Sequence, residues 1–308
     1  MNELSNHYSE EFVTLSEAEK RQLRALYRRS NGLGILQLTA HVFLIALALW
    51  LVHTSVATPW YLPSAFILGA ILTFLFPPLH DFIQRTAFRS RILNDVVATA
   101  AGFILWLPPN YFRAFHLEHH RWTQVKNRDP ELIDKILDTR LQLLLHLSGY
   151  RYWYGNIRAL IHHARGRIKE PYIKPSKSPA VIVEARCFLF IYALCLAGSI
   201  FAFNGVLILY WWIPLLLGQP LLRLYLLAEH TLCPFTTDMF RNTRTTLTGQ
   251  LVRFISWNMP YHVEHHASMA IPFHALPAAH QLLQSRVKTQ TPGYIAFHRQ
   301  LLETLRNL

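Results

Sequence analysis

Four long apolar stretches dominate the pattern along the chain, and none of them contains Lys, Arg, Asp or Glu. They cover residues 36–56, 62–79, 187–203 and 206–222. Each is close to the ~20 residues that a helix needs to cross about 30 Å of hydrocarbon. Four such stretches in 308 residues disfavour the alternative, buried helices of a soluble protein. The pattern therefore predicts an all-α integral membrane protein with four transmembrane helices.

Short breaks divide these stretches into two pairs. Asn204-Gly205 alone interrupts the uncharged run that contains the third and fourth stretches, and such a residue pair favours a turn. A similar break at 57–61, which contains Pro59, separates the first two stretches. We therefore expect two transmembrane hairpins, with a helical cap formed by the remaining polar segments.

Positive charge is distributed unevenly around the stretches. Lys and Arg number 5 in residues 1–35, 17 in 80–186 and 8 in 223–308, and the turn within each pair holds none. Because Lys and Arg concentrate on the cytoplasmic side, we expect both termini and the whole cap to be cytoplasmic. The formal net charge of +12 then reflects topology and attraction to membrane lipids. It does not require a nucleic-acid partner.

The expected organisation has five segments. They are a cytoplasmic N-terminal segment (1–35), a first transmembrane hairpin (36–83), cytoplasmic and interfacial helices (84–186), a second hairpin (187–230) and a cytoplasmic C-terminal region (231–308). A shorter apolar run at 92–107 contains Asp95 and ends at Pro108-Pro109. We expect this run to lie along the interface or to dip into the membrane.

The number of histidines is the first sign of chemistry in this sequence. The chain has 17 His against 18 acidic residues, which no packing rule requires. Two groups read HxxHH, at 116–120 and 262–266. A helix turns ~100° per residue, so positions i, i+3 and i+4 fall within about 100° of one another. We therefore expect each group to aim three imidazoles at one point.

Two further histidines lie just beyond the second and fourth stretches, at similar expected depths. With the HxxHH groups they make eight candidate metal ligands, which are His80, His116, His119, His120, His230, His262, His265 and His266. One structural zinc needs only four ligands, so eight indicate two metal ions. Imidazole suits iron, copper, nickel and zinc alike. The zinc-peptidase patterns HExxH and HxxEH are both missing from the sequence, which disfavours that class.

Several acidic residues adjoin these histidines. Asp81, Glu118, Glu229 and Glu264 are each next to a candidate ligand. Each either accepts a hydrogen bond that fixes the tautomer of an imidazole or is a solvated carboxylate on a helix face. Asp129 either serves the same purpose or caps the following helix.

The histidine groups and their surroundings resemble the integral-membrane fatty acid desaturase superfamily, whose mark is three boxes of the type HxxxH, HxxHH and HxxHH. The resemblance covers roughly residues 62–276. Local segments that are similar to a bacterial branch are LHDFIQRTAFRSRILND, YFRAFHLEHHRWTQ, RLYLLAEHTLCP and NMPYHVEHHASMAIPFHALP.

This resemblance implies a non-haem di-iron centre whose ligands are the eight histidines named above, with no further catalytic side chain. It also implies O2 as cosubstrate, electrons from a ferredoxin or a similar donor, and a fatty acid or acyl-lipid substrate. The expected location is the bacterial inner membrane, with the active site on the cytoplasmic side.

One position departs from the family pattern, because the second histidine of the first box is Gln84. On a helix that begins after Pro77-Pro78, His80 and Gln84 lie at i and i+4 on one face. Gln84 therefore points where the family places an imidazole. It either binds the metal weakly, holds a water on it, or hydrogen-bonds another ligand.

Desaturation is the outcome that the resemblance favours. Hydroxylation, and decarboxylation of a free fatty acid to a terminal alkene, would use the same box residues. A histidine-lined metal transporter is a different class, and it predicts ionisable or polar residues deep within the spans. His41 and Gln219 are the main candidates there, whereas every clustered histidine lies outside the apolar stretches.

Overall fold

The computed structural model describes residues 16–132 and 139–306, and this part of the chain is mostly helical. Four helical segments are long and apolar enough to cross a membrane, which confirms the predicted number of spans. They are α3 (Asn31–Ser55), α4 (Tyr61–Thr73) continued by α5 (Phe76–Gln84), α10 (Ser178–Phe201), and the π-helical turn η1 (Ile208–Trp212) continued by α11 (Ile213–His230).

The remaining elements are short. Before and between the spans lie α2 (Glu17–Ala25), α6 (Arg91–Ile104), α7 (Pro109–Trp122), α8 (Arg140–Leu147) and α9 (Tyr150–Ala164). After the spans come α12 (Met239–Asn242), β1 (Thr245–Thr246), α13 (Gln250–Ile255), α14 (His262–Ala267), η2 (Phe273–Ala275), α15 (Leu276–Leu283), β2 (Gln290–Thr291) and α16 (Tyr294–Thr304).

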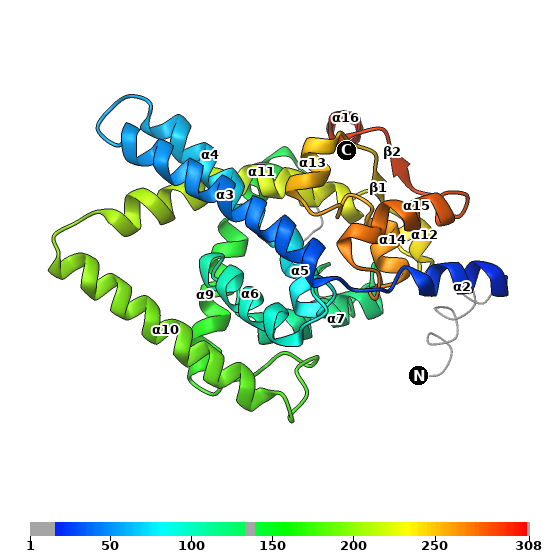
Figure 1. Ribbon diagram of the computed structural model, residues 1–308, viewed down its shortest axis with the longest axis horizontal. Coiled ribbons are helices and arrows are strands. Elements are labelled where there is room, and N and C mark those ends of the chain that lie inside the picture. The colour runs from blue at the N-terminus through cyan, green and yellow to red at the C-terminus, as the bar shows by residue number, and fades with distance from the viewer. Residues whose placement is uncertain (1–15, 133–138, 307–308) are drawn as a thin grey trace.

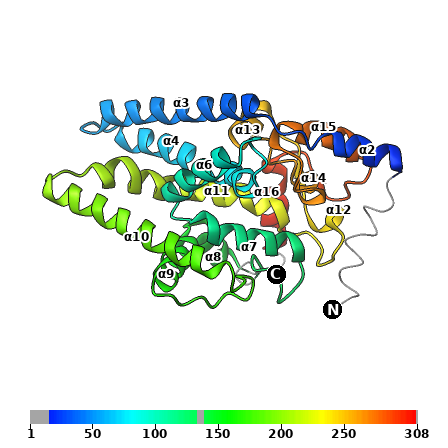
Figure 2. The same ribbon diagram turned by 60° about the horizontal axis from the view of Figure 1, so that its bottom comes forward.

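The long apolar helices project to one side of the molecule. Figures 1 and 2 show α3, α4 and α10 extending away from the C-terminal elements α12–α16, and both turns between consecutive spans lie at the far end. Large apolar side chains on these helices are exposed, among them Phe43 (64%) on α3 and Phe190 (63%) on α10. An exposed apolar surface of this kind is what a lipid environment covers.

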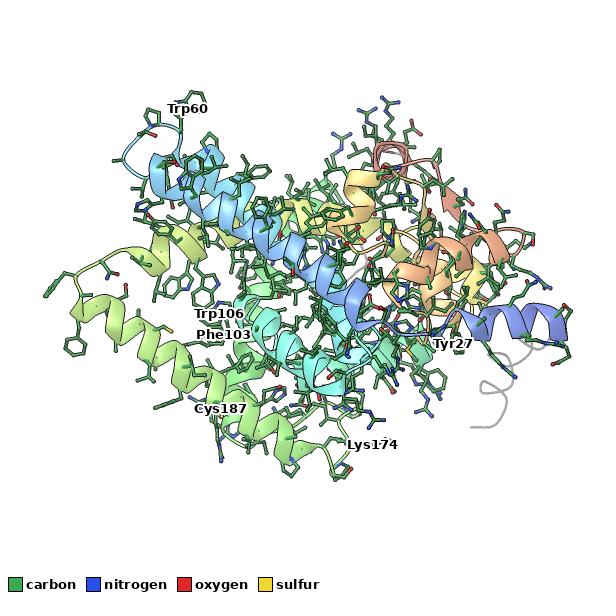
Figure 3. The ribbon with its side chains drawn as sticks, in the orientation of Figure 1. Tyr27, Trp60, Phe103, Trp106, Lys174 and Cys187 are labelled. Carbon is green, nitrogen blue, oxygen red and sulfur yellow. The ribbon has the colours of Figure 1, made fainter. Side chains whose placement is uncertain are left out.

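The packing of the spans departs from a simple arrangement of two hairpins. Helix α4 packs on both α3 and α11, whereas α10 packs chiefly on α9 and has no comparable contact with α11. Side chains from the end of α6 fill the space between α10 and η1. Phe103 stacks on Tyr192 and on Trp211, and Trp106 stacks on Tyr192; Figure 3 labels Phe103 and Trp106 at this place. The aromatic wedge explains why the predicted second hairpin is splayed.

Two glycines allow α4 and α11 to cross at very close range. A Cβ atom added at Gly69 would overlap the carbonyl of Pro214, and one added at Gly218 would overlap the backbone of Gly69. The Thr73 hydroxyl also lies 3.4 Å from the Gly218 carbonyl oxygen. Backbones can approach this closely only where both helices present small residues. The crossing therefore fixes how the two helices lie against each other on their way to the cap.

The apolar run that was expected at 92–107 forms α6 and the turn after it. Helices α6 and α7 meet at 98°, across a break of no more than four residues, so they do not form one straight span. Helix α6 ends at Ile104, and Pro109 begins α7 at the first helical position, where proline is favoured. The bend turns α7, which carries the second histidine group, toward the interior of the protein.

The C-terminal region folds around the third histidine group. The two-residue strands β1 and β2 pair in parallel, and the Thr245 side chain lies at the start of α14. Every residue from His262 to His266 is buried. Helix α2 packs against α15 and closes this region from the N-terminal side.

Candidate metal centre

The eight candidate histidines come together in the interior from four separate elements. Helix α5 supplies one, α7 supplies three, the last residue of α11 supplies one, and α14 supplies three. No more than 5% of the surface of any of them is exposed. The fold therefore brings together all eight histidines that were selected from the sequence.

The first cluster is centred on His120. Its Nε2 atom lies 2.9 Å from His116 Nε2 and 3.1 Å from His265 Nε2. The ring of His80 is 4.3 Å from that of His116, centroid to centroid. Gln84 belongs to this cluster, because its Nε2 atom lies 3.3 Å from His120 Nε2 and 3.4 Å from His265 Nε2.

The second cluster is centred on His230. Its Nε2 atom lies 3.2 Å from His119 Nε2 and 3.1 Å from His262 Nε2. His266 completes the group, since one nitrogen each of His119, His230 and His266 lie within 4.8 Å of one another. The clusters adjoin, because the rings of His120 and His266 stack at 4.0 Å.

Each HxxHH group is divided between the clusters, and the expectation that one group aims at one point was wrong. His116 and His120 face the first cluster while His119 faces the second. His265 likewise faces the first cluster and His266 the second. The three histidines of a group spread over about 100° around the helix axis. That spread is wide enough for neighbouring side chains to point to different clusters, so each group contributes to both.

The spacing of the nitrogens fits bound metal ions. A neutral imidazole offers one N–H and one lone pair, so His120 Nε2 cannot pair with all three nitrogens that lie within 3.3 Å of it. Two nitrogens that are each ~2.1 Å from one metal, at 90–109°, lie roughly 3.0–3.4 Å apart. The distances within both clusters match that spacing.

Burial keeps most of these imidazoles neutral. Removal from water, and then the proximity of the other imidazoles, lower the pKa well below its usual value for five of them. These are His116, His120, His262, His265 and His266. A metal ion requires the neutral form of histidine, so the environment prepares the side chains for coordination.

Asp129 holds one imidazole in place. Its Oδ1 atom accepts a 2.9 Å hydrogen bond from His119 Nδ1, and its Oδ2 atom accepts one of 2.9 Å from the Gln124 backbone N–H. Burial raises the pKa of Asp129, but the charge that His119 carries when protonated, and the hydrogen bonds from His119 and from the Gln124 backbone, outweigh this and leave the pKa of Asp129 lowered. The carboxylate therefore stays ionised and leaves the Nε2 lone pair of His119 for the cluster.

Three other clustered histidines also have a hydrogen-bond partner at their Nδ1 atom. They pair as His80 with the Phe76 carbonyl at 3.0 Å, His230 with the Asn242 carbonyl at 3.3 Å, and His266 with the Thr123 hydroxyl at 3.2 Å. A fixed Nδ1–H orients the ring and directs Nε2 toward the metal. Nothing in the histidine spacing pointed to these partners, because they come from loops and from helix backbone.

The carboxylates next to the histidines differ in where they point. Glu229 Oε2 lies 3.7 Å from His262 Nε2. Asp81 instead accepts from the Thr86 hydroxyl at 2.7 Å, and Glu264 is bound by His280 Nδ1 and by the Thr245 hydroxyl, each at 2.6 Å. Glu118 lies in a basic pocket on the other face of α7. Of these four residues, Glu229 alone lies within 4 Å of a clustered histidine nitrogen in the described part of the chain.

Sequence reasoning missed Glu131. Its Oε1 atom lies 4.0 Å from His119 Nε2, and 16% of its side chain is exposed. Its backbone N–H donates to Asp129 Oδ1 at 2.9 Å. The only signal in the sequence was its position two residues after Asp129.

A cavity of about 240 Å³ lies beside the clusters. Phe76 and Phe112 in its wall contact the His80 ring, and Glu131 and Glu229 in its wall lie near the second cluster. Leu226, Leu227 and other apolar side chains line the remainder, together with a few polar groups. Mostly apolar walls with a small number of polar groups are typical of ligand sites.

Four candidate membrane-spanning helices and two buried histidine clusters that could hold metal ions are the features to compare with known proteins. The sequence profile of the fatty acid desaturase family matches residues 57–298. The chain therefore belongs to the fatty acid desaturase family, which confirms the resemblance drawn from the histidine boxes.

Curated relatives at low identity are desaturases. The chain is 26% identical over 260 residues to a chloroplastic omega-6 fatty acid desaturase of Glycine max, covering 78% of this chain and 59% of the relative. It is 23% identical to an sn-1 oleoyl-lipid 12-desaturase of Anabaena variabilis, covering 92% and 85%. It is 26% identical to a dihydrorhizobitoxine desaturase of Bradyrhizobium elkanii, covering 92% and 83%. The chain thus spans about three fifths of the soybean enzyme and most of the two bacterial ones.

Proposed function

We propose that the protein is an O2-dependent di-iron oxidoreductase that removes hydrogen from an unactivated acyl chain, with desaturation as the favoured outcome. The observation that carries the proposal is the pair of adjoining buried histidine clusters, assembled from the three boxes of a desaturase-family chain. The names of the relatives support a fatty acid or acyl-lipid substrate.

Nine side chains would hold the two ions. His80, Gln84, His116, His120 and His265 would serve one ion, and His119, His230, His262 and His266 the other. When bound, the iron supplies the oxidising power that side-chain acids and bases lack. The chain's own part is to fix the ligand geometry, to exclude water through Phe76 and Phe112, and to hold the acyl chain in the cavity.

A second pocket supports the proposal of a ferredoxin or similar acidic electron donor. Five cations, Arg85, Arg113, Arg121, Lys174 and Lys177, line a pocket of about 610 Å³. Six of its lining residues belong to α7, and three of these, Ala114, Glu118 and Arg121, lie on the face opposite the histidines of that helix. A donor docked there would be about one helix diameter, roughly 10 Å, from the first cluster. Complementary charge speeds such an encounter.

The proposed orientation places the termini, the clusters and the basic pocket in the cytoplasm of a bacterial cell. Two observations support it. The turns at 57–60 and 202–206 lack Lys and Arg, and both lie at the end of the molecule opposite the C-terminal elements (Figure 1).

Metal analysis with product analysis tests the proposed function. Purified protein should contain about two irons per chain when fully loaded, and cells that express it should accumulate new unsaturated acyl chains, detected by mass spectrometry of their lipids. Alkenes one carbon shorter than the acid would select decarboxylation, and oxygenated chains would select hydroxylation. Full activity of a zinc-loaded, iron-free protein would contradict the di-iron assignment.

Replacing Gln84 by histidine should raise iron content when iron is limiting. The Gln84 Oε1 atom is buried with no hydrogen-bond partner, and an amide oxygen is a weaker donor to ferrous iron than imidazole. Iron content and the rate of iron loss to a chelator measure the effect. Equal iron content and equal chelator resistance in the two proteins would show that Gln84 is not a ligand.

A further inference from the structure

One face of α11 carries both a cation and a histidine of the second cluster. Arg223, Leu226, Leu227 and His230 occupy positions i, i+3, i+4 and i+7, which share a helix face. The first three line the cavity of about 240 Å³, and the fourth is at the centre of the second cluster. The two ends of this face are about 10 Å apart along the helix axis. A ligand in the cavity can therefore reach from the cation toward the metal site.

The Arg223 guanidinium lines this cavity and keeps hydrogen-bond donors unused. Its Nε and Nη2 atoms are buried and make no hydrogen bond within the described residues. The guanidinium carbon lies 4.7 Å from the centre of the Tyr152 ring. Glu131 and Glu229 line the same cavity and attract the Arg223 charge through space, without a hydrogen bond to its Nε or Nη2 atom. A buried cation with no hydrogen-bonded anion is costly, and this favours a ligand that supplies one.

The chemistry of the cavity favours a carboxylate. A guanidinium presents a planar fork that matches the two oxygens of a carboxylate. Asn156, whose buried Nδ2 atom lies beside Tyr152, lines the same cavity, and so does Arg151. Glu131 and Glu229 would repel a doubly charged phosphate more strongly than a singly charged acid. The Leu226 and Leu227 side chains between the cation and the cluster fit the first carbons of an aliphatic chain.

We infer that Arg223 binds the carboxylate of an unesterified fatty acid in this cavity, with the chain running over Leu226 and Leu227 toward the clusters. The inference rests on the proposed function and deepens it. It makes the free acid the substrate class, and it sets the position of attack by the distance from the carboxylate.

Equilibrium binding to the iron-loaded enzyme, without reductant, tests the inference. The probes are dodecanoate and its methyl ester, at pH 8 in the same detergent. Dodecanoate should bind at least about tenfold more tightly than the ester, because hydrogen bonds to charged groups contribute a factor of about ten or more. Arg223→Gln should weaken binding of the acid about tenfold to a hundredfold and change binding of the ester by less than about twofold.

Two further variants distinguish recognition of the carboxylate by Arg223 from a role of Arg223 in packing. Arg223→Lys keeps the charge and should retain part of the preference for the acid. Arg158→Gln, on an exposed part of α9 outside this cavity, should behave like the wild type. Equal binding of acid and ester by the wild type would overturn the inference. Loss of both ligands in both Arg223 variants would assign Arg223 to structure and also overturn it. Either result would leave iron content and acyl products intact, so the proposed function would stand.

Discussion

Replacement of His265 by alanine should abolish turnover and lower the iron content from about two to about one per chain. His265 Nε2 lies 3.1 Å from His120 Nε2 and 3.4 Å from Gln84 Nε2, so it faces the middle of the first cluster. The remaining donors would include the weak Gln84 amide, and His265 itself is fully buried. Elemental analysis and product analysis of the same preparation measure the two effects.

A histidine outside the clusters provides the control. His162, on the solvent side of α9, lines a separate pocket with Arg158 and Arg167. His162→Ala should retain the iron and the turnover of the wild type. An active His265→Ala protein with about two irons per chain would contradict the assignment of the first cluster as a metal site.

Asp129→Asn should lower the affinity for one of the two irons about tenfold to a hundredfold, the usual effect of removing a group that orients a ligand. The amide can present its NH2 group to His119 Nδ1, which would move the imidazole proton to Nε2 and block coordination. The loss should appear as faster release of one iron to a chelator, with the other released at the wild-type rate.

Asp95→Asn is the matched control, because Asp95 pairs with Arg85 on the surface at 2.8 Å and contacts neither cluster. Its iron release should match that of the wild type. Thermal unfolding of both variants in detergent shows whether the fold is preserved. Uniform loss of both irons from Asp129→Asn, with a lower melting temperature, would show that Asp129 supports the fold and not His119 alone.

The local parts of this site were predictable from sequence. Absence of charge over about 20 residues identifies a membrane-spanning helix without knowledge of its neighbours. The i, i+3, i+4 spacing of His116, His119 and His120 places three imidazoles on one edge of a helix. The position of Gln84 followed from the same periodicity, one turn after His80.

The features of the site that depend on tertiary packing were not predictable from the sequence. The division of each HxxHH group between two clusters is decided by where α14 lies relative to α7. Glu264 adjoins His265 in sequence, yet it binds His280, which lies 16 positions further along the chain. The splayed second hairpin depends on Phe103 and Trp106, aromatic residues of a segment that sequence patterns assigned to the interface.

The contact between Gly69 and Gly218 has a consequence for the reactivity of the metal pair. His80 follows Gly69 by eleven residues along α4 and α5, and His230 follows Gly218 by twelve along α11. One histidine belongs to each cluster, so the separation of the two proposed metal positions would be set in part by a backbone contact between two candidate membrane spans, two or more helical turns away. Evolution could therefore adjust the magnetic and chemical coupling of the two ions by changing a helix crossing, with every ligand left in place.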